Sequence, residues 1–262
     1  MPELPEVETV ARELRAQLVG RQFAGASIGW PRTLATPDPD ALAARLTGQT
    51  VVEVGRRGKY ILILLDSGDM LIIHLRMTGN LTVVPYADPA GENDHVRARF
   101  DLADGDRLVF TDARKFGRVW LVSDASAVTG KLGPEPLAWD FTPEVLAARL
   151  RRRRTAIKAL LLDQTAVAGI GNIYADEALF RAGIHPLRNS ASLTDAEIAA
   201  LHAALQAVLN ESINKNGTLL RDYRTPYGTE GAFREQLRVY QQTGRPCPRC
   251  GAPIERIRVT QR

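Results

Sequence analysis

The sequence predicts an α+β protein in which a helix and a β-sandwich or barrel-like domain precede a helical domain. Three observations indicate this class. Apolar residues near the start recur at spacings of three and four, namely Val7, Val10, Leu14 and Leu18. Short β-rich runs follow one another between residues 51 and 122. Beyond residue 142 the apolar spacing becomes helical and capping residues occur.

The chain opens with MPELPEVETV, which predicts the start of the first helix. Proline suits a first helical turn because it lacks the N–H that this turn leaves unpaired. Carboxylates complement the positive end of the helix dipole, and Glu3, Glu6 and Glu8 are placed there. With Gly20 as the stop, we expect a helix of about four turns.

The N-terminal domain is predicted to span residues 1–130 and to be a β-sandwich. Its strand-like runs are VVEVGRR, YILILLD, MLIIHLRM, NLTVV, HVRARFDL, RLVFTD and GRVWLV. The breaks DSGD and ADGD have turn chemistry, and the second predicts a hairpin. We expect these strands to form sheets around one core, with the first helix packed on them.

The segment KLGPEPLAWDFTP is rich in proline and small residues, so it predicts a linker over 131–141. A helical domain over 142–235 follows. Thr142 is expected to cap a helix that begins at Pro143. Further helices are predicted over TAIKALLLDQ, over 172–181 and over 194–214, the last opened by the capping box TDAE. The tail, 236–262, predicts a β-hairpin that carries C-x-x-C.

The composition is that of a globular protein, with 45% hydrophobic and 24% charged residues. No basic segment followed by an apolar core marks a secretory signal, and the longest apolar run, YILILL, has only strand length. Two cysteines make no disulfide framework. We therefore expect a cytoplasmic protein with no membrane partner.

Positive charge is gathered in three short clusters. The formal net charge is +4, and residues 244–262 alone, with five arginines and one glutamate, account for it. The other clusters are RRRR at 151–154 and RRGK at 56–59. Basic patches on a nearly neutral body favour a polyanionic partner. Solvated helix faces produce the same runs, so charge alone leaves both interpretations open.

The second residue offers a nucleophile if Met1 is removed. Pro2 then carries a secondary amine, and because α-amines have pKa values near about 8, a useful fraction is neutral around pH 7. Attack on a sugar C1′ gives a cationic iminium ion, which acidifies the C2′ proton and makes strand cleavage by elimination accessible. Glu3 is placed to act as acid and base. A proline followed by a glutamate at a helix start is also typical of a simple helix cap. These two residues alone therefore do not decide between a catalytic and a structural role.

Blocks along essentially the whole chain share one resemblance. In order they are PELPEVETV, RRGKY, HLRMTG, DARKFG, LGPEPL, TAIKALLLDQ, GIGNIYADEALF and RPCPRCG. They resemble the formamidopyrimidine-DNA glycosylases, bacterial repair enzymes for oxidised purines that are related to endonuclease VIII. Leu4, where endonuclease VIII members typically carry glycine, favours the purine branch.

The resemblance implies a bifunctional DNA glycosylase and AP lyase of base excision repair. Such an enzyme excises 8-oxoguanine and formamidopyrimidines from damaged double-stranded DNA through a Schiff base on its N-terminal proline, followed by β,δ-elimination. We expect a monomer that associates with the bacterial nucleoid. Two alternatives stay open: an endonuclease VIII-like glycosylase for oxidised pyrimidines, and a non-catalytic protein that binds damaged DNA.

The resemblance also assigns catalytic roles. Pro2 resembles the nucleophile, and Glu3 resembles the proton shuttle. Lys59 resembles a lysine that contacts phosphate beside the lesion, although alone it would suggest a surface cation at a strand end. Glu6 resembles a second acidic residue that helps to hold the site.

Further residues resemble the family's DNA contacts. Met77, Arg114 and Phe116 are similar to the residues that fill the gap left when a nucleotide is extruded from the duplex. Taken alone, the methionine and phenylalanine would suggest core packing and the arginine a surface charge. His74 is a candidate phosphate contact, with a structural histidine as the alternative.

GIGNIYADE resembles the turn and helix of the family's helix–two-turn–helix element. Its two glycines permit close backbone approach, and the helix N-terminus is expected to present free N–H groups to a phosphate. Asn172 is the expected side-chain contact. Residues 221–233 resemble the loop that closes over the flipped base, and a plain linker would have the same composition.

The tail departs from the family pattern. Family members carry a zinc finger of two C-x-x-C pairs on a β-hairpin, whereas this chain has only Cys247 and Cys250. A structural zinc site needs four ligands. Arg262 falls at the finger's conserved phosphate-bridging arginine, so we expect the natural protein to continue, to carry the second pair and to bind one structural Zn²⁺. The alternative is a degenerate finger without zinc.

Overall fold

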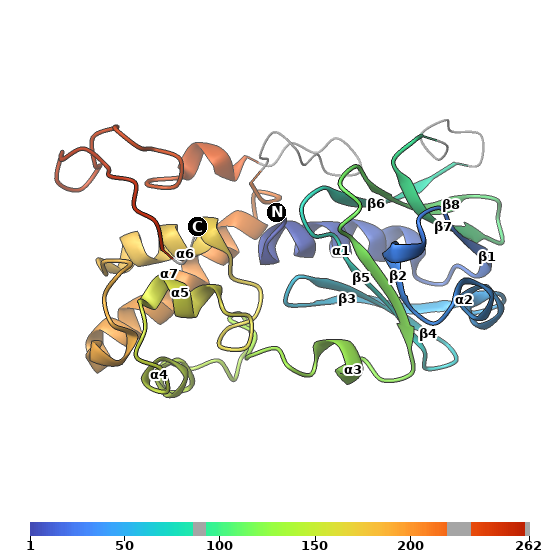
Figure 1. Cartoon of the computed structure of the whole chain (residues 1–262), viewed down its shortest axis with the longest axis horizontal. Coiled ribbons are helices and arrows are strands. Elements are labelled where there is room, and N and C mark those ends of the chain that lie inside the picture. The colour runs from blue at the N-terminus through green and yellow to red at the C-terminus, as the bar shows by residue number, and fades with distance from the viewer. Residues whose placement is uncertain (86–92, 219–231, 260–262) are drawn as a thin grey trace. The chain divides into compact units, whose positions relative to one another are not determined.

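The computed structural model describes residues 1–85, 93–218 and 232–259 of the chain, which forms two compact units (Figure 1). Unit 1 contains Met1–Pro2 and Glu6–Lys131. Unit 2 contains Glu3–Pro5, Leu132–Thr218 and residues 232–259. The first five residues of the chain are thus divided between the units.

The first helix, α1, spans Leu4–Leu18 and confirms the prediction from apolar spacing. Val7, Val10, Leu14 and Leu18 are all fully buried, because spacings of three and four place them on one face. Gly20 follows with φ = +83°, a left-handed conformation that glycine adopts at little cost and that ends the helix.

Unit 1 contains two sheets. The four-stranded sheet has the order β1–β7–β8–β6, formed by Phe23–Ile28, Val96–Leu102, Arg107–Asp112 and Gly79–Val84. The five-stranded sheet has the order β2–β9–β5–β4–β3, formed by Leu34–Thr36, Arg118–Val122, Met70–His74, Tyr60–Leu65 and Val51–Arg57. All seven predicted runs are therefore strands, and ADGD joins the antiparallel pair β7 and β8 as predicted.

One hydrophobic core joins both sheets and α1. In β4 the side chains of Ile61, Ile63 and Leu65 are buried, while the residues between them are partly exposed, as a strand with one inward face requires. Phe23 and Phe100 of the other sheet meet edge to face, with ring centroids 6.3 Å apart. This arrangement is the predicted β-sandwich with a packed helix.

The elements between α1 and β3 were not predicted. Strand β1 reads FAGASI, whose small residues and glycine give a weak strand signal. Helix α2, Pro39–Leu46, begins at the cap Asp38, which accepts the Ala41 N–H at 2.9 Å. It buries only Leu42 and Leu46. Packing on the sheets decides these short elements. The four-residue helix α3, Ser126–Thr129, was also missed.

Unit 2 is helical, with α4 at Pro143–Arg151, α5 at Ile157–Leu162, α6 at Asn172–Ala182 and α7 at Asp195–Ile213 (Figure 1). Thr142 caps α4, and Thr194 with Glu197 forms the predicted capping box of α7. Helix α6 packs on α7, and α4 packs on α7 as well. Across the described part of the chain, no helix is long and apolar enough to cross a membrane.

The predicted β-hairpin of the tail is shorter than expected. After the 3-10 turn η4, Phe233–Gln236, the β pairing within the described tail is one isolated bridge between Pro246 and Pro253. The Cys247 N–H donates across this bridge to the Ala252 carbonyl at 2.7 Å, and the Ile254 N–H donates to the Arg245 carbonyl at 2.9 Å. Most of the predicted loop (221–231) and Arg262 lie outside the described residues.

Candidate active site and DNA interface

Glu3 binds the start of helix α6, and both belong to unit 2. Its Oε1 accepts the Ile173 N–H at 3.1 Å, and its Oε2 accepts the Tyr174 N–H at 3.5 Å. The residue is only 3% exposed. Because a helix N-terminus carries unpaired N–H groups and partial positive charge, α6 stabilises the Glu3 carboxylate.

Two glycines let the N-terminal segment approach α6 this closely. A Cβ on Gly171, the N-cap of α6, would lie 2.3 Å from Cδ of Glu3. A Cβ on Gly169 would lie 2.8 Å from Cβ of Leu4, and its φ of +83° also favours glycine. The Leu4 N–H donates to the Gly169 carbonyl at 3.0 Å. The G-x-G pair therefore makes room for residues 3 and 4 of the same chain.

Asn172 is the first residue of α6. The prediction that this helix start presents its free N–H groups to phosphate is wrong for Ile173 and Tyr174, since both donate to Glu3. The side-chain oxygen of Asn172 is buried and accepts no hydrogen bond from the described residues. The Asn172 side chain thus stays a candidate contact, on a helix whose first turn is already bonded to the chain's own carboxylate.

Pro2 is buried, whereas Met1 is 39% exposed. While Met1 is present, the Pro2 nitrogen belongs to an amide, and its lone pair is delocalised into the carbonyl. Chemistry at this nitrogen therefore requires removal of Met1. Glu6, on the first turn of α1, is only 3% exposed.

Lys59 lies in the turn between β3 and β4. Gly58 adopts φ = +57° there, which the absence of a Cβ permits. The Arg56 guanidinium holds the turn, donating to the Gly58 carbonyl at 2.9 Å and to Glu8 Oε2 at 3.1 Å. Lys59 is only 4% exposed, so it is not a solvated surface cation.

His74, the last residue of β5, is buried with its ring edge-to-face against Tyr60, the centroids 4.6 Å apart. Its Nδ1 accepts the Arg76 N–H at 3.0 Å, so the ring proton sits on Nε2. Burial, followed by the positive charges of Arg76 and Lys59, lowers the pKa of His74 from 6.5 to about 3. The ring is neutral at physiological pH, and its Nε2–H is a hydrogen-bond donor.

This lowered pKa predicts a pH effect on stability. Below pH 6.5 the unfolded chain gains a proton at His74 that the folded chain does not take up, so the unfolding free energy falls as pH drops from about 6.5 towards 3. At pH 5 the loss is about 2 kcal/mol. We expect His74→Asn, whose side-chain oxygen replaces Nδ1 as acceptor, to lack this loss in urea unfolding at pH 7.5 and 5.

His185 provides the matched control, because its Nδ1 accepts the N–H of Leu187 in the same way, at 3.3 Å, on an exposed side chain. Other groups titrate in every variant and cancel in the comparison. If His74→Asn and His185→Asn show the same dependence on pH as the unmodified chain, the effect of burying the His74 ring is refuted.

Met77, Arg114 and Phe116 all lie in unit 1 and are exposed. Met77 is 39% exposed and Phe116 is 50% exposed, so the alternative of core packing is wrong for both. The Arg114 guanidinium lies over the Phe116 ring at 5.1 Å from its centroid. Two large apolar side chains and a guanidinium are thus displayed on turns that follow β5 and β8.

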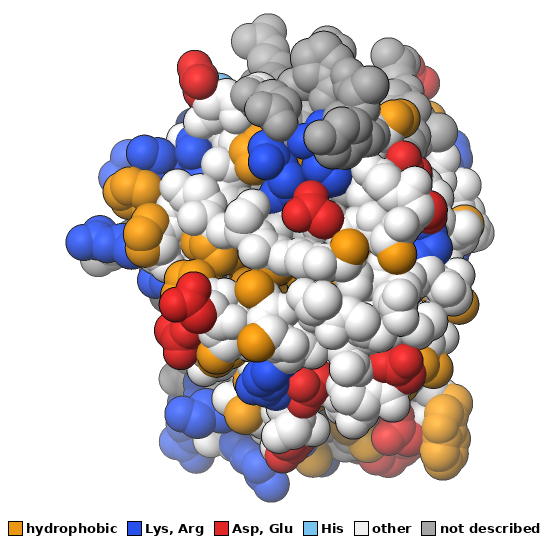
Figure 2. All heavy atoms as spheres, turned by 90° about the vertical axis from the view of Figure 1, so that its right-hand side faces the viewer, with side chains coloured by type: hydrophobic (Ala, Val, Ile, Leu, Met, Phe, Trp, Pro, Cys, Tyr) orange, Lys and Arg blue, Asp and Glu red, His pale blue; other side chains and the backbone are white. Residues whose placement is uncertain are grey.

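The basic clusters are partly paired within the protein. Three of their arginines bond to carboxylates, in the pairs Arg56–Glu8, Arg151–Asp195 and Arg153–Asp163. Figure 2 shows Lys and Arg side chains interspersed with Asp and Glu over one face of the molecule. The runs of basic residues in the sequence therefore overstate the positive charge that is available to a polyanion.

Cys247 and Cys250 lie on a tight turn in the tail. The Cys247 N–H donates to the Ala252 carbonyl at 2.7 Å, and the Gly251 N–H donates to the Cys247 carbonyl at 2.8 Å. The Arg249 N–H points to Cys247 Sγ at 3.4 Å and, as the first cause, lowers the pKa of that thiol. This geometry suits two thiolate ligands. Within the described residues no group of three or more potential ligands gathers around a metal.

Two domain models match consecutive parts of the chain. The formamidopyrimidine-DNA glycosylase N-terminal domain matches residues 1–119, and the formamidopyrimidine-DNA glycosylase H2TH domain matches residues 132–223. The chain belongs to the formamidopyrimidine-DNA glycosylase family. Curated glycosylases of that name agree: the protein of Chloroflexus aggregans is 54% identical, covering 100% of this chain and 95% of its own length. The protein of Herpetosiphon aurantiacus is 51% identical, and the match covers 100% of this chain and 96% of that protein.

Solved structures of glycosylases from this family have the same fold. The crystal structure of MutM (FPG) from Thermus thermophilus matches with a TM-score of 0.89 at 39% identity, covering 100% of this chain and 95% of that one. A Lactococcus lactis FPG mutant in complex with Fapy-dG-containing DNA matches with a TM-score of 0.92 at 37% identity, covering 100% and 96%. The predicted α+β fold is confirmed.

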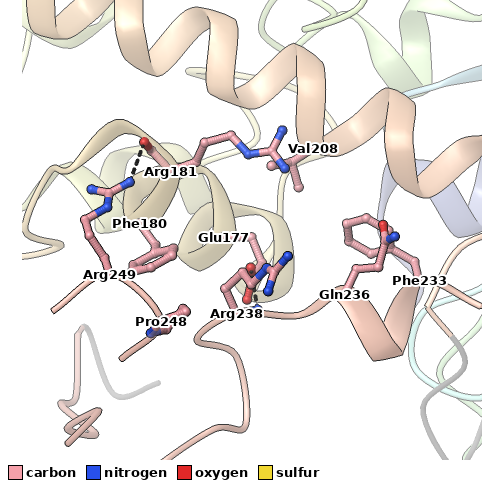
Figure 3. A pocket seen from close by; sticks show the side chains of 9 residues that line it. All are labelled: Glu177, Phe180, Arg181, Val208, Phe233, Gln236, Arg238, Pro248 and Arg249. Carbon is pink, nitrogen blue, oxygen red and sulfur yellow. Dashed lines mark hydrogen bonds between the residues drawn. The ribbon is translucent and has the colours of Figure 1, made fainter. Parts of the chain in front are cut away.

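This glycosylase-family chain also contains a buried carboxylate that the sequence did not single out. Glu177, on α6, is 5% exposed and accepts the backbone N–H groups of Arg238, Val239 and Tyr240, each at 2.9 Å. It borders a pocket of about 460 Å³ (Figure 3), lined also by Phe180, Arg181, Val208, Phe233, Gln236, Arg238, Pro248 and Arg249. Glu177 thus ties the start of the tail to α6. The sequence alone gives no sign of these backbone hydrogen bonds to Glu177.

Proposed function

We propose that this chain is a bifunctional enzyme that excises oxidised purines from damaged double-stranded DNA and then cleaves the strand as an AP lyase. Family membership carries the first part, a DNA glycosylase of base excision repair. The Lactococcus lactis relative was solved as a mutant with DNA containing Fapy-dG and as the wild type with DNA containing N7-benzyl-Fapy-dG, and we propose 8-oxoguanine and formamidopyrimidines as substrates here. The observation that supports the lyase is Glu3, held at the α6 N-terminus directly after Pro2.

The first step uses the Pro2 amine that removal of Met1 exposes. Its lone pair forms a bond to C1′ of the damaged nucleotide, and the bond from C1′ to the base breaks. The base departs with the bonding electrons and takes up the proton that the Pro2 nitrogen loses, so this nitrogen regains a lone pair. Glu3 then donates a proton to the ring oxygen as the C1′–O4′ bond opens, which leaves a cationic iminium between Pro2 and C1′.

The second step cleaves the strand. The iminium withdraws electrons from C2′, so a base, for which Glu3 is proposed, removes a C2′ proton and the electron pair expels the 3′ phosphate. A base then removes the C4′ proton, and in this second elimination the electron pair expels the 5′ phosphate. Water then adds to the iminium carbon, the sugar fragment leaves as an aldehyde, and Pro2 regains its free amine.

Access to the nucleotide requires that it leave the base stack. We propose that Met77 occupies the vacated stack, that Phe116 wedges beside the opposite base and that Arg114 donates hydrogen bonds to the orphaned base. All three are exposed on neighbouring turns. Lys59, His74 and Asn172 are the proposed phosphate contacts, together with Arg262. Affinity is then expected to fall steeply with salt.

We propose that Cys247 and Cys250 supply two of the four ligands of one structural zinc ion. Their turn fits this role, since a backbone N–H already points to Cys247 Sγ. Bound zinc would fix the tail that Glu177 ties to α6. No step proposed for Pro2 and Glu3 takes place at the metal. We also propose that the enzyme acts as a monomer.

Competition between lesions tests the proposed substrate class. Duplexes of different length, one with 8-oxoguanine and one with thymine glycol, are offered together to Met-free protein, and strand cleavage is followed on a denaturing gel. We expect the 8-oxoguanine strand to be cleaved at least about tenfold faster. Preferred cleavage of thymine glycol would indicate an endonuclease VIII-like enzyme. Binding without turnover, on abasic DNA as well, would indicate a non-catalytic protein.

A further inference from the structure

Asp112, the last residue of β8, gathers an unusual number of hydrogen bonds. It is 1% exposed. Its Oδ1 accepts the Thr78 hydroxyl and the Arg114 N–H, the latter at 3.1 Å. Its Oδ2 accepts the N–H groups of Phe116 and Gly117, each at 2.7 Å. An ionised carboxylate is an acceptor only, so both oxygens are fully used.

These four donors come from two separate turns. Thr78 follows Met77 in the turn between β5 and β6, whereas Arg114, Phe116 and Gly117 belong to the turn between β8 and β9. The Arg114 N–H also lies 3.2 Å from Thr78 Oγ1. A single buried carboxylate therefore joins the turn that displays Met77 to the turn that displays the arginine and the phenylalanine.

Both turns contain a residue in a costly backbone conformation. Arg76 has φ = +56° and Lys115 has φ = +59°, in the left-handed region that non-glycine residues rarely adopt. Such conformations persist when the surroundings hold them. His74 Nδ1 holds the first by accepting the Arg76 N–H, and the Asp112 carboxylate spans the second.

Close packing leaves the carboxylate little freedom. A Cβ on Gly117 would lie 2.3 Å from the Phe110 ring and 3.2 Å from Asp112 Oδ2. The Arg97 guanidinium donates to the Asp112 carbonyl at 2.7 Å and so fixes its backbone. The side chain is thus set before any DNA arrives.

We propose that Asp112 is a positioning residue that presets Met77, Arg114 and Phe116 as one unit for insertion into the base stack. This inference rests on the proposed function of the three residues. Because the turns are already ordered, no ordering entropy is lost at the moment of insertion. Asp112 acts through the turns and touches neither base nor sugar.

Asp112→Asn is the direct test, because it keeps the shape but replaces one acceptor oxygen by an NH2 group. Each carboxylate oxygen of Asp112 accepts two hydrogen bonds. In either orientation of the asparagine amide, its NH2 group therefore faces two donors, and both donors lose their acceptor. We expect single-turnover excision of 8-oxoguanine from a duplex to fall about tenfold or more. Borohydride capture on a single-stranded abasic oligonucleotide, which has no opposite base and no stack to fill, should stay within about twofold.

Thr78 supplies a second, milder pair of variants should Asp112→Asn fold poorly. Thr78→Val removes the hydroxyl at constant shape and is expected to slow duplex excision, while Thr78→Ser restores the donor and the rate. Asp124→Asn is the matched control, since this exposed carboxylate likewise accepts a turn N–H, that of Ser126 at 2.8 Å. Fluorescence of 2-aminopurine placed opposite the lesion reports insertion directly, and its response should be lower in Asp112→Asn.

Two outcomes overturn the inference. One is duplex excision at the unmodified rate in both Asp112→Asn and Thr78→Val. The other is an equal loss on duplex and single-stranded substrates, which would make Asp112 a general structural residue. Failure of the unmodified, Met-free chain to form any borohydride adduct would instead refute the proposed function and is recognised before the variants are compared.

Discussion

Replacing Pro2 by glycine is expected to reduce borohydride capture of abasic or 8-oxoguanine duplex by roughly a hundredfold, the size of one catalytic group's contribution. A secondary amine forms an iminium that stays cationic until it is hydrolysed. The primary amine of glycine forms an imine that is cationic only when protonated, so elimination is less favoured. Denaturing gels of the trapped complex, with mass spectrometry of the linked peptide, measure the effect.

The matched control for Pro2→Gly is the same chain with Met1 retained. Every side chain is then unchanged, and only the nitrogen is blocked by an amide. We expect this form to bind damaged duplex but to give no adduct. If it nicks oxidised DNA at the normal rate, or if the adduct maps to a lysine, Pro2 is not the nucleophile.

Glu3→Gln is expected to lower single-turnover excision by about 10² to 10⁴, because an amide neither gives nor takes the protons that the sugar chemistry requires. The carbonyl oxygen of the new amide can still accept one N–H of α6, so binding to a duplex with an abasic analogue should be nearly unchanged. Glu53→Gln, at an exposed position of β3, is the control and should keep full activity. Excision is followed by gel, and binding by fluorescence anisotropy.

A second route to the same defect leaves Glu3 in place. In Gly171→Ala the new Cβ would lie 2.3 Å from Cδ of Glu3, so the carboxylate must move from the start of α6. We expect a loss of excision in the same direction, with Gly25→Ala as the control, since its Cβ would meet nothing closer than 3.6 Å. Full activity in both Glu3→Gln and Gly171→Ala would remove Glu3 from the mechanism.

The local pattern of apolar and capping residues was enough to predict most of the helices and strands. Apolar spacing in α1, alternation in β4 and the threonine caps of α4 and α7 each depend on neighbours within one or two turns. Local pattern did not predict β1 or α2, because β1 becomes regular by pairing with β7 and α2 by packing against β1. In the described tail, the predicted hairpin is limited to one isolated bridge between Pro246 and Pro253.

The sequence by itself determined the family and the residues available for chemistry: a proline that becomes an amine, a glutamate beside it, and apolar and basic residues in family blocks. Only the tertiary structure decided what these groups contact. It set the Glu3 carboxylate on the N–H groups of α6, 170 positions away, made His74 neutral by burying it, and joined two turns through Asp112. The physical reason is that hydrogen bonds and burial depend on distance in space, and a sequence records only distance along the chain.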